Sequence, residues 1–173
     1  MCETGISLTD TDTDTDTDTM NHLSLQDQYA PHSICFGCGP ANKNGLQIKS
    51  FVEGENVIAH FTPKPFHAAF PNVLNGGIIG ALLDCHCNWA ASYYFMRDHQ
   101  LTAPSCTVTA EYAIQLKRPT PINTELKLIA RLKSIDRKKI IIDGELWAND
   151  KLCDTCTGTF VVVDETHPAF HRW

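Results

Sequence analysis

The segment from residue 75 to residue 96 most strongly constrains how this chain can fold. Its sequence is NGGIIGALLDCHCNWAASYYFM, in which Ile78, Leu82 and Cys85 recur at the spacing of one helix face. Apolar residues also occupy the opposite face, a pattern typical of a helix buried on all sides. Asp84 is the only Asp, Glu, Lys or Arg in the segment. Because desolvating a carboxylate costs several kcal/mol, Asp84 must be paired, neutralised or used in chemistry.

The same segment is unsuited to crossing a membrane. Asp84, His86 and Asn88 lie in its middle, and they leave no strongly hydrophobic run of the roughly 18 residues that a membrane span needs. We therefore interpret residues 75–96 as the core helix of a soluble domain and expect no membrane partner.

The charge distribution separates the first 18 residues from the rest of the chain. The 173 residues match the size of one ordinary domain. The formal charge of -6 arises from Glu3 and five aspartates at positions 10 to 18, because the remaining 14 acidic residues match the 14 lysines and arginines. The neutral remainder disfavours a general nucleic-acid-binding protein.

Composition also sets the expected domain boundaries. Thr and Asp alternate from residue 9 to residue 19, a pattern with the period of a strand but with no apolar face to bury. It therefore predicts disorder. We expect a disordered acidic tail at residues 1–28, a single folded domain at residues 29–164 and a short C-terminal tail at residues 165–173.

The eight cysteines suggest a disulfide framework, but the first 30 residues lack the basic and apolar regions of a secretory signal. We expect reduced thiols in a cytoplasmic protein. Cys35 and Cys38 form one CxxC motif, and Cys153 and Cys156 form another in a segment that alternates like a strand. Positions three apart on a strand point to opposite faces, so we expect no metal and no other cofactor. The first motif is interpreted as a tight glycine-rich loop.

Alternating apolar residues predict strands on both sides of the helix. Residues 46–52 and 57–61 are joined by Glu-Gly-Glu-Asn, which is typical of a hairpin. After the helix, four further segments alternate, at residues 107–117, 126–132, 140–148 and 153–163. The order of two strands, one long helix and four strands predicts an α+β fold with an antiparallel sheet on one helix.

Four motifs in this order resemble the acyl-CoA thioesterases of the hotdog fold, specifically their phenylacetate-pathway branch. They are CFGCGPANKNGL from residue 35, FPNVLNGGIIGALLD at the helix, the Val-Thr-Ala-Glu strand that ends in Lys-Arg-Pro, and Gly-Thr-Phe-Val near the C-terminus. The resemblance spans about residues 33–164 and implies an antiparallel sheet curled round one central helix.

The resemblance also implies an active site. The backbone amide of Gly76 would polarise the thioester carbonyl, and Asp84 would act as nucleophile or general base. Thr109 would hold the attacking water or the carboxylate. Asn75 stands where the family commonly has His, and its side-chain amide can still donate a hydrogen bond to a carbonyl.

Elementary chemistry assigns the same roles. Free amides at a helix N-terminus stabilise an oxyanion, and Gly76 with Gly77 permits close approach of the backbone. Asp84 is the best candidate to attack the carbonyl or to activate water. The structural alternatives are a plain helix-entry turn for the two glycines and a hydrogen-bonded structural carboxylate for Asp84.

Two further groups are candidates for substrate binding. The loop that approaches the helix carries His67 and Phe70, which we expect to line the pocket. Basic residues on the later strands could contact the phosphates of coenzyme A, although a solvated surface explains them equally well. The basic candidates are Lys117, Arg118, Arg137 and Lys138.

These observations predict hydrolysis of an acyl-CoA thioester, and the alternative is a non-catalytic acyl-CoA-binding or regulatory hotdog protein. A dehydratase would need Asp84 and His86 to converge, and a thiol nucleophile would need Cys85 to face His86, which helix spacing forbids. Gly76 and Asp84 lie about 12 Å apart along one helix. Both can act on one carbon only if they come from two chains, so we expect a homodimer, or a tetramer of two dimers.

Overall fold

The computed structural model describes residues 23–170, which form two helices, a short 3-10 turn and eight strands. Their bounds are α1 Leu25–Tyr29, β1 Ser50–Glu53, β2 Asn56–Phe61, η1 Pro65–His67, β3 Ala68–Phe70, β4 Val73–Leu74, α2 Gly76–Asp98, β5 Thr107–Leu116, β6 Leu126–Asp136, β7 Lys139–Ala148 and β8 Lys151–Val162.

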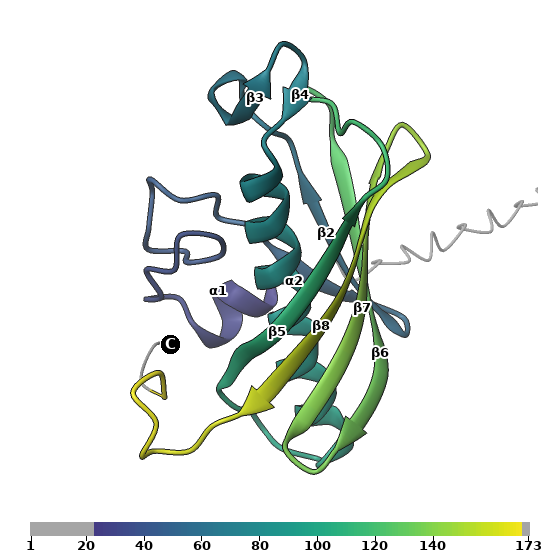
Figure 1. The fold of residues 1–173 in the computed structure, drawn as a ribbon. Coiled ribbons are helices and arrows are strands. Elements are labelled where there is room, and N and C mark those ends of the chain that lie inside the picture. Colours follow the sequence, from purple (N-terminus) through teal and green to yellow (C-terminus); the bar gives the residue numbers. More distant parts are fainter. Residues whose placement is uncertain (1–22, 171–173) are drawn as a thin grey trace, which may run out of the picture.

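Six strands form one antiparallel sheet in the order β1-β2-β6-β7-β8-β5, and β3 pairs with β4 separately. Figure 1 shows the large sheet curling along one side of α2. The predicted α+β architecture, an antiparallel sheet around one long helix, is therefore confirmed. The sheet leaves β5 at one edge, where it pairs with β8 alone.

The central helix α2 is covered on two sides. On the side of α2 that faces the sheet, Cys87 lies against Gly144 of β7. Figure 1 shows that the segment before β1 lies on the side away from the sheet. There the Trp89 indole N–H donates to Cys38 Sγ over 3.3 Å. Most side chains from Ile79 to Phe95 are buried. Both faces of the helix are apolar because the sheet covers one and the segment before β1 covers the other. No helix within residues 23–170 has the length and hydropathy to span a membrane.

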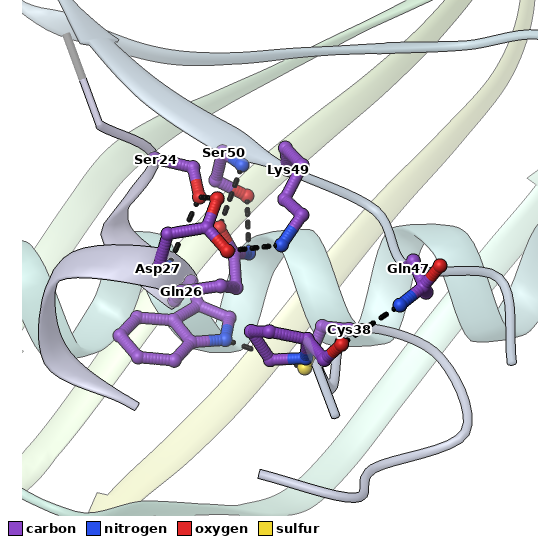
Figure 2. Close-up of polar contacts among 9 residues, drawn as sticks. Ser24, Gln26, Asp27, Cys38, Gln47, Lys49 and Ser50 are labelled. Atoms are coloured by element: carbon purple, nitrogen blue, oxygen red, sulfur yellow. Dashed lines mark hydrogen bonds and ion pairs between the residues drawn. The ribbon is translucent and has the colours of Figure 1, made fainter. Parts of the chain in front are cut away.

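The helix α1 corrects the predicted start of the folded domain. Residues 25–28 were assigned to the tail, but Leu25 and Gln26 are buried. The Gln26 side chain donates to Ser50 Oγ over 3.0 Å and accepts from the Ser50 backbone N–H over 2.8 Å. Lys49 Nζ lies 2.5 Å from Asp27 Oδ1 (Figure 2). These contacts fasten α1 to β1, while the Thr-Asp repeat lies outside the described residues.

Three strand assignments also change. The first strand begins at Ser50 rather than at residue 46, because Gln47 has a positive φ of 51° and the amide of Ile48 bonds to the loop at Gly37. Leu132 pairs with buried Ile142 ahead of a bulge between Leu132 and Ser134, yet it is 41% exposed although alternation predicted it inside. A second irregularity skips Cys153, so Cys153 and Cys156 are both buried instead of facing opposite sides.

Candidate active site

The Asp84 carboxylate is half-buried on α2 and is positioned by the edge strand β5. Thr109 Oγ1 donates to Asp84 Oδ1 over 2.7 Å. Asn88 lies one turn later on α2, and its side-chain N–H donates to Thr109 Oγ1 over 3.2 Å. The hydroxyl of Thr107 donates to Asn88 Oδ1 over 2.9 Å. This directed chain of hydrogen bonds holds the carboxylate in a fixed orientation as an acceptor.

A cavity of about 650 Å³ opens beside this carboxylate. Its walls combine α2, β5 and the segment that leads into the CxxC loop. The lining residues are His32, Ser33, Ile34, Cys35, Cys38, Asp84, Cys85, Asn88, Trp89 and Thr109. A concave space with a few converging polar groups is the usual form of a small-molecule site.

The N-terminus of α2 presents a free backbone donor. Asn75 is the N-cap, and its Oδ1 accepts from the Gly77 N–H over 2.8 Å. Among residues 23–170 no acceptor is recorded for the N–H of Gly76, which is exposed. A side chain at residue 76 would meet only the tip of Leu116, at 3.6 Å. The side-chain oxygen Oδ1 of Asn75 therefore caps the helix, and the side-chain NH2 group is the part left to donate.

The two catalytic candidates lie apart within one protomer. Asp84 is placed against Thr109, near the start of β5, whereas Gly76 is placed against Leu116 at its end. Eight residues of helix separate them by about 12 Å. The fold thus keeps the expected separation and does not bring both groups into one cavity of a single chain.

The basic candidates divide between the same two ends of β5. Lys117 and Arg118 follow its last residue and donate their backbone N–H groups to the Cys153 carbonyl. Arg137 and Lys138 lie at the turn between β6 and β7, next to Val162, which pairs with Thr107. The four predicted phosphate contacts therefore do not converge within one chain.

The loop histidine lies in a second cavity, close to the N-terminus of α2. His67 stacks on Phe61 at 5.7 Å between ring centroids, and its carbonyl accepts from the Asn75 N–H. Burial and the nearby Lys64 lower the pKa of His67. The cavity measures about 490 Å³ and also includes Ile78. Phe70 is 62% exposed on β3, and neither residue lines the cavity beside Asp84.

The histidine on α2 serves the core. His86 is fully buried, with Nδ1 2.9 Å from Ser50 Oγ and Nε2 3.1 Å from the Val57 carbonyl oxygen. Burial lowers its pKa to about 4, so the ring is neutral at physiological pH. It points towards β1 and β2 whereas Asp84 points towards β5, which agrees with the rejection of a His86 partnership with Asp84 or Cys85.

The structure adds a group of thiols that the sequence interpretation missed. Cys85 of α2 meets Cys35 and Cys38, and the three Sγ atoms lie within 4.8 Å of one another. Hydrogen bonds from the Cys38 and Cys85 thiols, followed by the backbone N–H groups of Cys38 and Gly37, lower the pKa of Cys35. The hydrogen bond with Cys35 raises the pKa of Cys38, and the hydrogen bonds with Cys35 and Cys38 raise the pKa of Cys85. The CxxC motif gave a sequence signal for Cys35 and Cys38, but no signal linked Cys85 to them.

No protein-family model matches the chain, and no curated protein matches it. Solved structures do. A thioesterase superfamily protein from Shewanella loihica is 34% identical, with 72% of this chain and 98% of that protein covered at a TM-score of 0.59. The Escherichia coli PaaI protein of the phenylacetic acid degradation operon is 15% identical. The match covers 69% of this chain and 81% of the PaaI chain at a TM-score of 0.59. A Streptococcus mutans protein bound to acetyl-CoA is 15% identical. The match covers 67% of this chain and 88% of that protein at a TM-score of 0.57.

The curled sheet, the central helix and the PaaI-like neighbours together define a protein of the hotdog fold, as predicted. Identity of 34% over nearly the whole Shewanella protein goes further than a shared fold. The chain belongs to the thioesterase superfamily.

Proposed function

We propose that the protein hydrolyses an acyl-CoA thioester to a free acid and coenzyme A. The observation that carries the proposal is the Thr109-bound carboxylate of Asp84 beside a cavity of about 650 Å³. Membership of the thioesterase superfamily supports the reaction class. The fold is also that of a protein solved with acetyl-CoA, which supports the coenzyme as the leaving group.

The chemistry needs one group to attack and one to receive negative charge. Asp84 either removes a proton from a water molecule that attacks the carbonyl carbon, or attacks that carbon itself to form an anhydride that water then hydrolyses. In both routes the carbonyl oxygen gains negative charge, which the exposed Gly76 N–H at the positive end of α2 stabilises. Collapse of this oxyanion breaks the carbon–sulfur bond and releases coenzyme A as the thiolate, which leaves the free acid in the first route and the anhydride in the second.

Each complete site takes its two groups from two chains. The strand β5 is a sheet edge, and its large apolar side chains Tyr112 and Leu116 are 45% and 60% exposed. An exposed apolar edge is a surface that a second strand covers. Antiparallel pairing of β5 with its copy brings Asp84 of one chain to the partner's Gly76. The same pairing brings Arg137 and Lys138 of one chain close to the partner's Lys117 and the partner's Arg118, which follow the end of β5. The phosphates of coenzyme A then contact both pairs of basic residues.

Replacement of Asp84 tests the assignment. Asp84→Asn keeps the volume and the acceptor for Thr109 but lowers basicity and nucleophilicity, so we expect thiol release from acyl-CoA to fall by at least about 100-fold. Thr109→Val, with Thr109→Ser as the matched control that keeps the hydroxyl, should cost less, about 2- to 10-fold. Circular dichroism checks that each variant folds. Near-normal turnover by folded Asp84→Asn protein contradicts the role of Asp84.

One observation favours a second candidate, a non-catalytic acyl-CoA-binding protein. Asn75 occupies the position at the start of α2 where related enzymes commonly carry His, and half of its amide is committed to the helix cap. A panel of acyl-CoAs separates the two functions. Tight binding by calorimetry without thiol release from any of them establishes the binding protein, whereas turnover that depends on Asp84 establishes the hydrolase.

A further inference from the structure

The thiols of Cys35, Cys38 and Cys85 form a compact three-sulfur group. All three Sγ atoms lie within 4.8 Å of one another, and the Cys35 and Cys85 sulfurs are 3.7 Å apart. A disulfide requires about 2.05 Å. Two thiolates bound to one tetrahedral zinc ion at about 2.3 Å each lie about 3.8 Å apart. The 3.7 Å between the Cys35 and Cys85 sulfurs fits an S–H···S hydrogen bond, and it also fits two ligands of one metal ion.

The loop that carries the first two thiols is built around the sulfur atoms. The backbone N–H groups of Gly37 and Cys38 contribute to the lowered pKa of Cys35, because N–H donors to sulfur stabilise a thiolate. The Gly39 N–H donates to the Cys35 carbonyl over 2.9 Å, which closes the turn.

Two glycines allow this loop to meet the helix. A Cβ at Gly37 would lie 2.3 Å from Cys85 Sγ, and a Cβ at Gly39 would lie 2.4 Å from the Cys35 nitrogen. Neither distance occurs between real atoms, so a side chain at residue 37 would push the loop away from Cys85, and one at residue 39 would distort the CxxC turn itself. The Trp89 indole N–H, 3.3 Å from Cys38 Sγ, fixes the remaining side of the group. The third thiol thus comes from α2 rather than from Cys153 or Cys156.

We propose that Cys35, Cys38 and Cys85 bind one thiophilic divalent ion of the zinc type, with the fourth coordination position facing the cavity beside Asp84. Three thiolates this close would repel one another without a cation, whereas a soft d10 ion accepts all three as ligands. The ion would fasten the CxxC loop to α2 one residue from Asp84. This proposal rests on the sulfur geometry and does not depend on the proposed hydrolase activity.

Cobalt and zinc titrations test the site directly. The full chain, reduced and freed of metal by a chelator, is titrated with Co²⁺ and then with Zn²⁺. We expect one equivalent of Co²⁺ to produce thiolate-to-cobalt charge-transfer bands and tetrahedral d–d bands, both abolished by one equivalent of Zn²⁺. Metal analysis of protein purified in zinc-containing medium should find one zinc per chain, and zinc should raise the melting temperature.

Serine variants identify the ligands. Cys85→Ser and Cys38→Ser should each weaken cobalt binding by at least about 100-fold. Cys153→Ser is the matched control, because Cys153 is also buried in a CxxC motif but lies outside the three-sulfur group, and the variant should bind cobalt as the wild type does. Competition with a chromophoric chelator gives each affinity.

Three results overturn the proposal. One is a folded wild-type chain without charge-transfer bands at saturating cobalt, and another is a Cys85→Ser variant that binds cobalt as tightly as the wild type. The third is a disulfide between Cys35 and either neighbour that persists in the protein as isolated, detected by mass spectrometry of unreduced peptides, which would assign the group to redox chemistry instead. A Cys85→Ser variant that does not fold is replaced by Cys38→Ser and by thiol alkylation with and without zinc, in which zinc should protect all three thiols.

Discussion

At the scale of single residues, Asn75 combines two roles that different substitutions separate. Its Oδ1 caps α2 through the Gly77 N–H, and its NH2 group remains to donate to a substrate carbonyl. Asn75→Ser keeps a good cap and loses the amide, so stability should hold while turnover falls about 2- to 10-fold. Asn75→His supplies a ring donor but a poor cap, so turnover should hold or rise while stability falls by about 1 kcal/mol.

Thermal unfolding and steady-state hydrolysis are measured on the same preparations, with Asn75→Ala as the variant that lacks both functions. Asn75→Ala should show both losses, a modest one in turnover and about 2–4 °C in melting temperature. If turnover follows the melting temperature across all three variants, Asn75 acts only as a cap.

The protonation state of Asp154 affects the stability of the fold, and a substitution tests this effect. It is fully buried on β8, Thr120 donates to its Oδ2 over 2.7 Å, and its Oδ1 has no partner within residues 23–170. Burial raises the pKa of Asp154, against the opposing effect of the Thr120 hydrogen bond. The folded state therefore holds this proton more tightly than the unfolded state, and stability is lost as pH rises through and above the unfolded value of about 3.9.

Asp154→Asn removes this dependence because the amide stays neutral and still offers an acceptor to Thr120. We expect the variant to be more stable than the wild type at pH 7 by about 1 kcal/mol, with a difference that shrinks towards pH 4. Chemical unfolding of both proteins between pH 4 and pH 8 measures it. A constant difference across that range would mean that the carboxylate is not the cause.

The sequence located some site residues and missed others for a physical reason. Asp84 stood out because a lone carboxylate in an apolar helix is costly, and the structure places Thr109 beside it as expected. Cys85 did not stand out, because its contact with Cys35 joins positions 50 residues apart and leaves no local spacing to read. Asn is favoured at a helix N-cap, but only the structure shows that Asn75 Oδ1 accepts from the Gly77 N–H and so leaves the NH2 group to donate.

At the scale of elements, two glycines set how α2 meets its neighbours. Gly144 of β7 lies under the helix, and a Cβ there would be 2.6 Å from Cys87 Sγ and 3.6 Å from Leu83 Cδ2. Gly80 of α2 faces β5, where a Cβ would lie 3.7 Å from both Ile114 Cδ1 and the Tyr112 hydroxyl. The first position has no room for a methyl group and the second does.

We therefore expect opposite effects from the same substitution. Gly144→Ala should destabilise the fold by about 1–3 kcal/mol through overpacking. Cys87→Ala in the same chain should recover part of this loss, because it removes the clashing sulfur. Gly80→Ala should stabilise by about 0.4–1 kcal/mol, because alanine restricts the unfolded chain and favours the helix. Urea unfolding of the four proteins gives each value, and a destabilising Gly80→Ala would show that another surface covers Gly80.

Elements with a clear period were predictable, and short ones were not. The helix α2 and the strands β5 to β8 are long enough for their apolar spacing to show. In contrast, α1 has five residues and follows a repetitive tail, and its position depends on the Gln26 contacts with Ser50. The bulge at Cys153 arises from strand pairing, so alternation along β8 alone could not reveal it.

At the scale of the whole molecule, the proposed two-chain site sets the register in which two copies would pair along β5. Asp84 lies against Thr109, and Gly76 lies against Leu116. Asp84 therefore meets the partner's Gly76 only if Thr109 opposes the partner's Leu116. In an antiparallel pair this register places the two-fold axis between Tyr112 and Ala113, in the middle of the exposed apolar part of the strand.

Mixed dimers test this arrangement. Gly76→Pro removes the amide donor at the first helical position, where proline is well tolerated and the preceding Asn75 is already extended at a ψ of 133°. It should fold and lose hydrolysis about 100- to 1000-fold, while Gly76→Ala, which keeps the N–H, should lose little. Co-refolded with inactive Asp84→Ala protein, it should regain about one quarter of wild-type activity, since half of the dimers are mixed and each has one intact site.

The Gly76→Pro, Asp84→Ala double variant gives the complementary result. A mixed dimer of this chain with the wild type has one defect in each shared site, so equal mixing should halve the activity of the wild-type chains. If each chain instead held a complete site, mixing would leave that activity unchanged, and the two single variants would never complement. Native mass spectrometry of isotope-labelled chains establishes that the subunits have exchanged. An active monomer in solution would exclude the shared site.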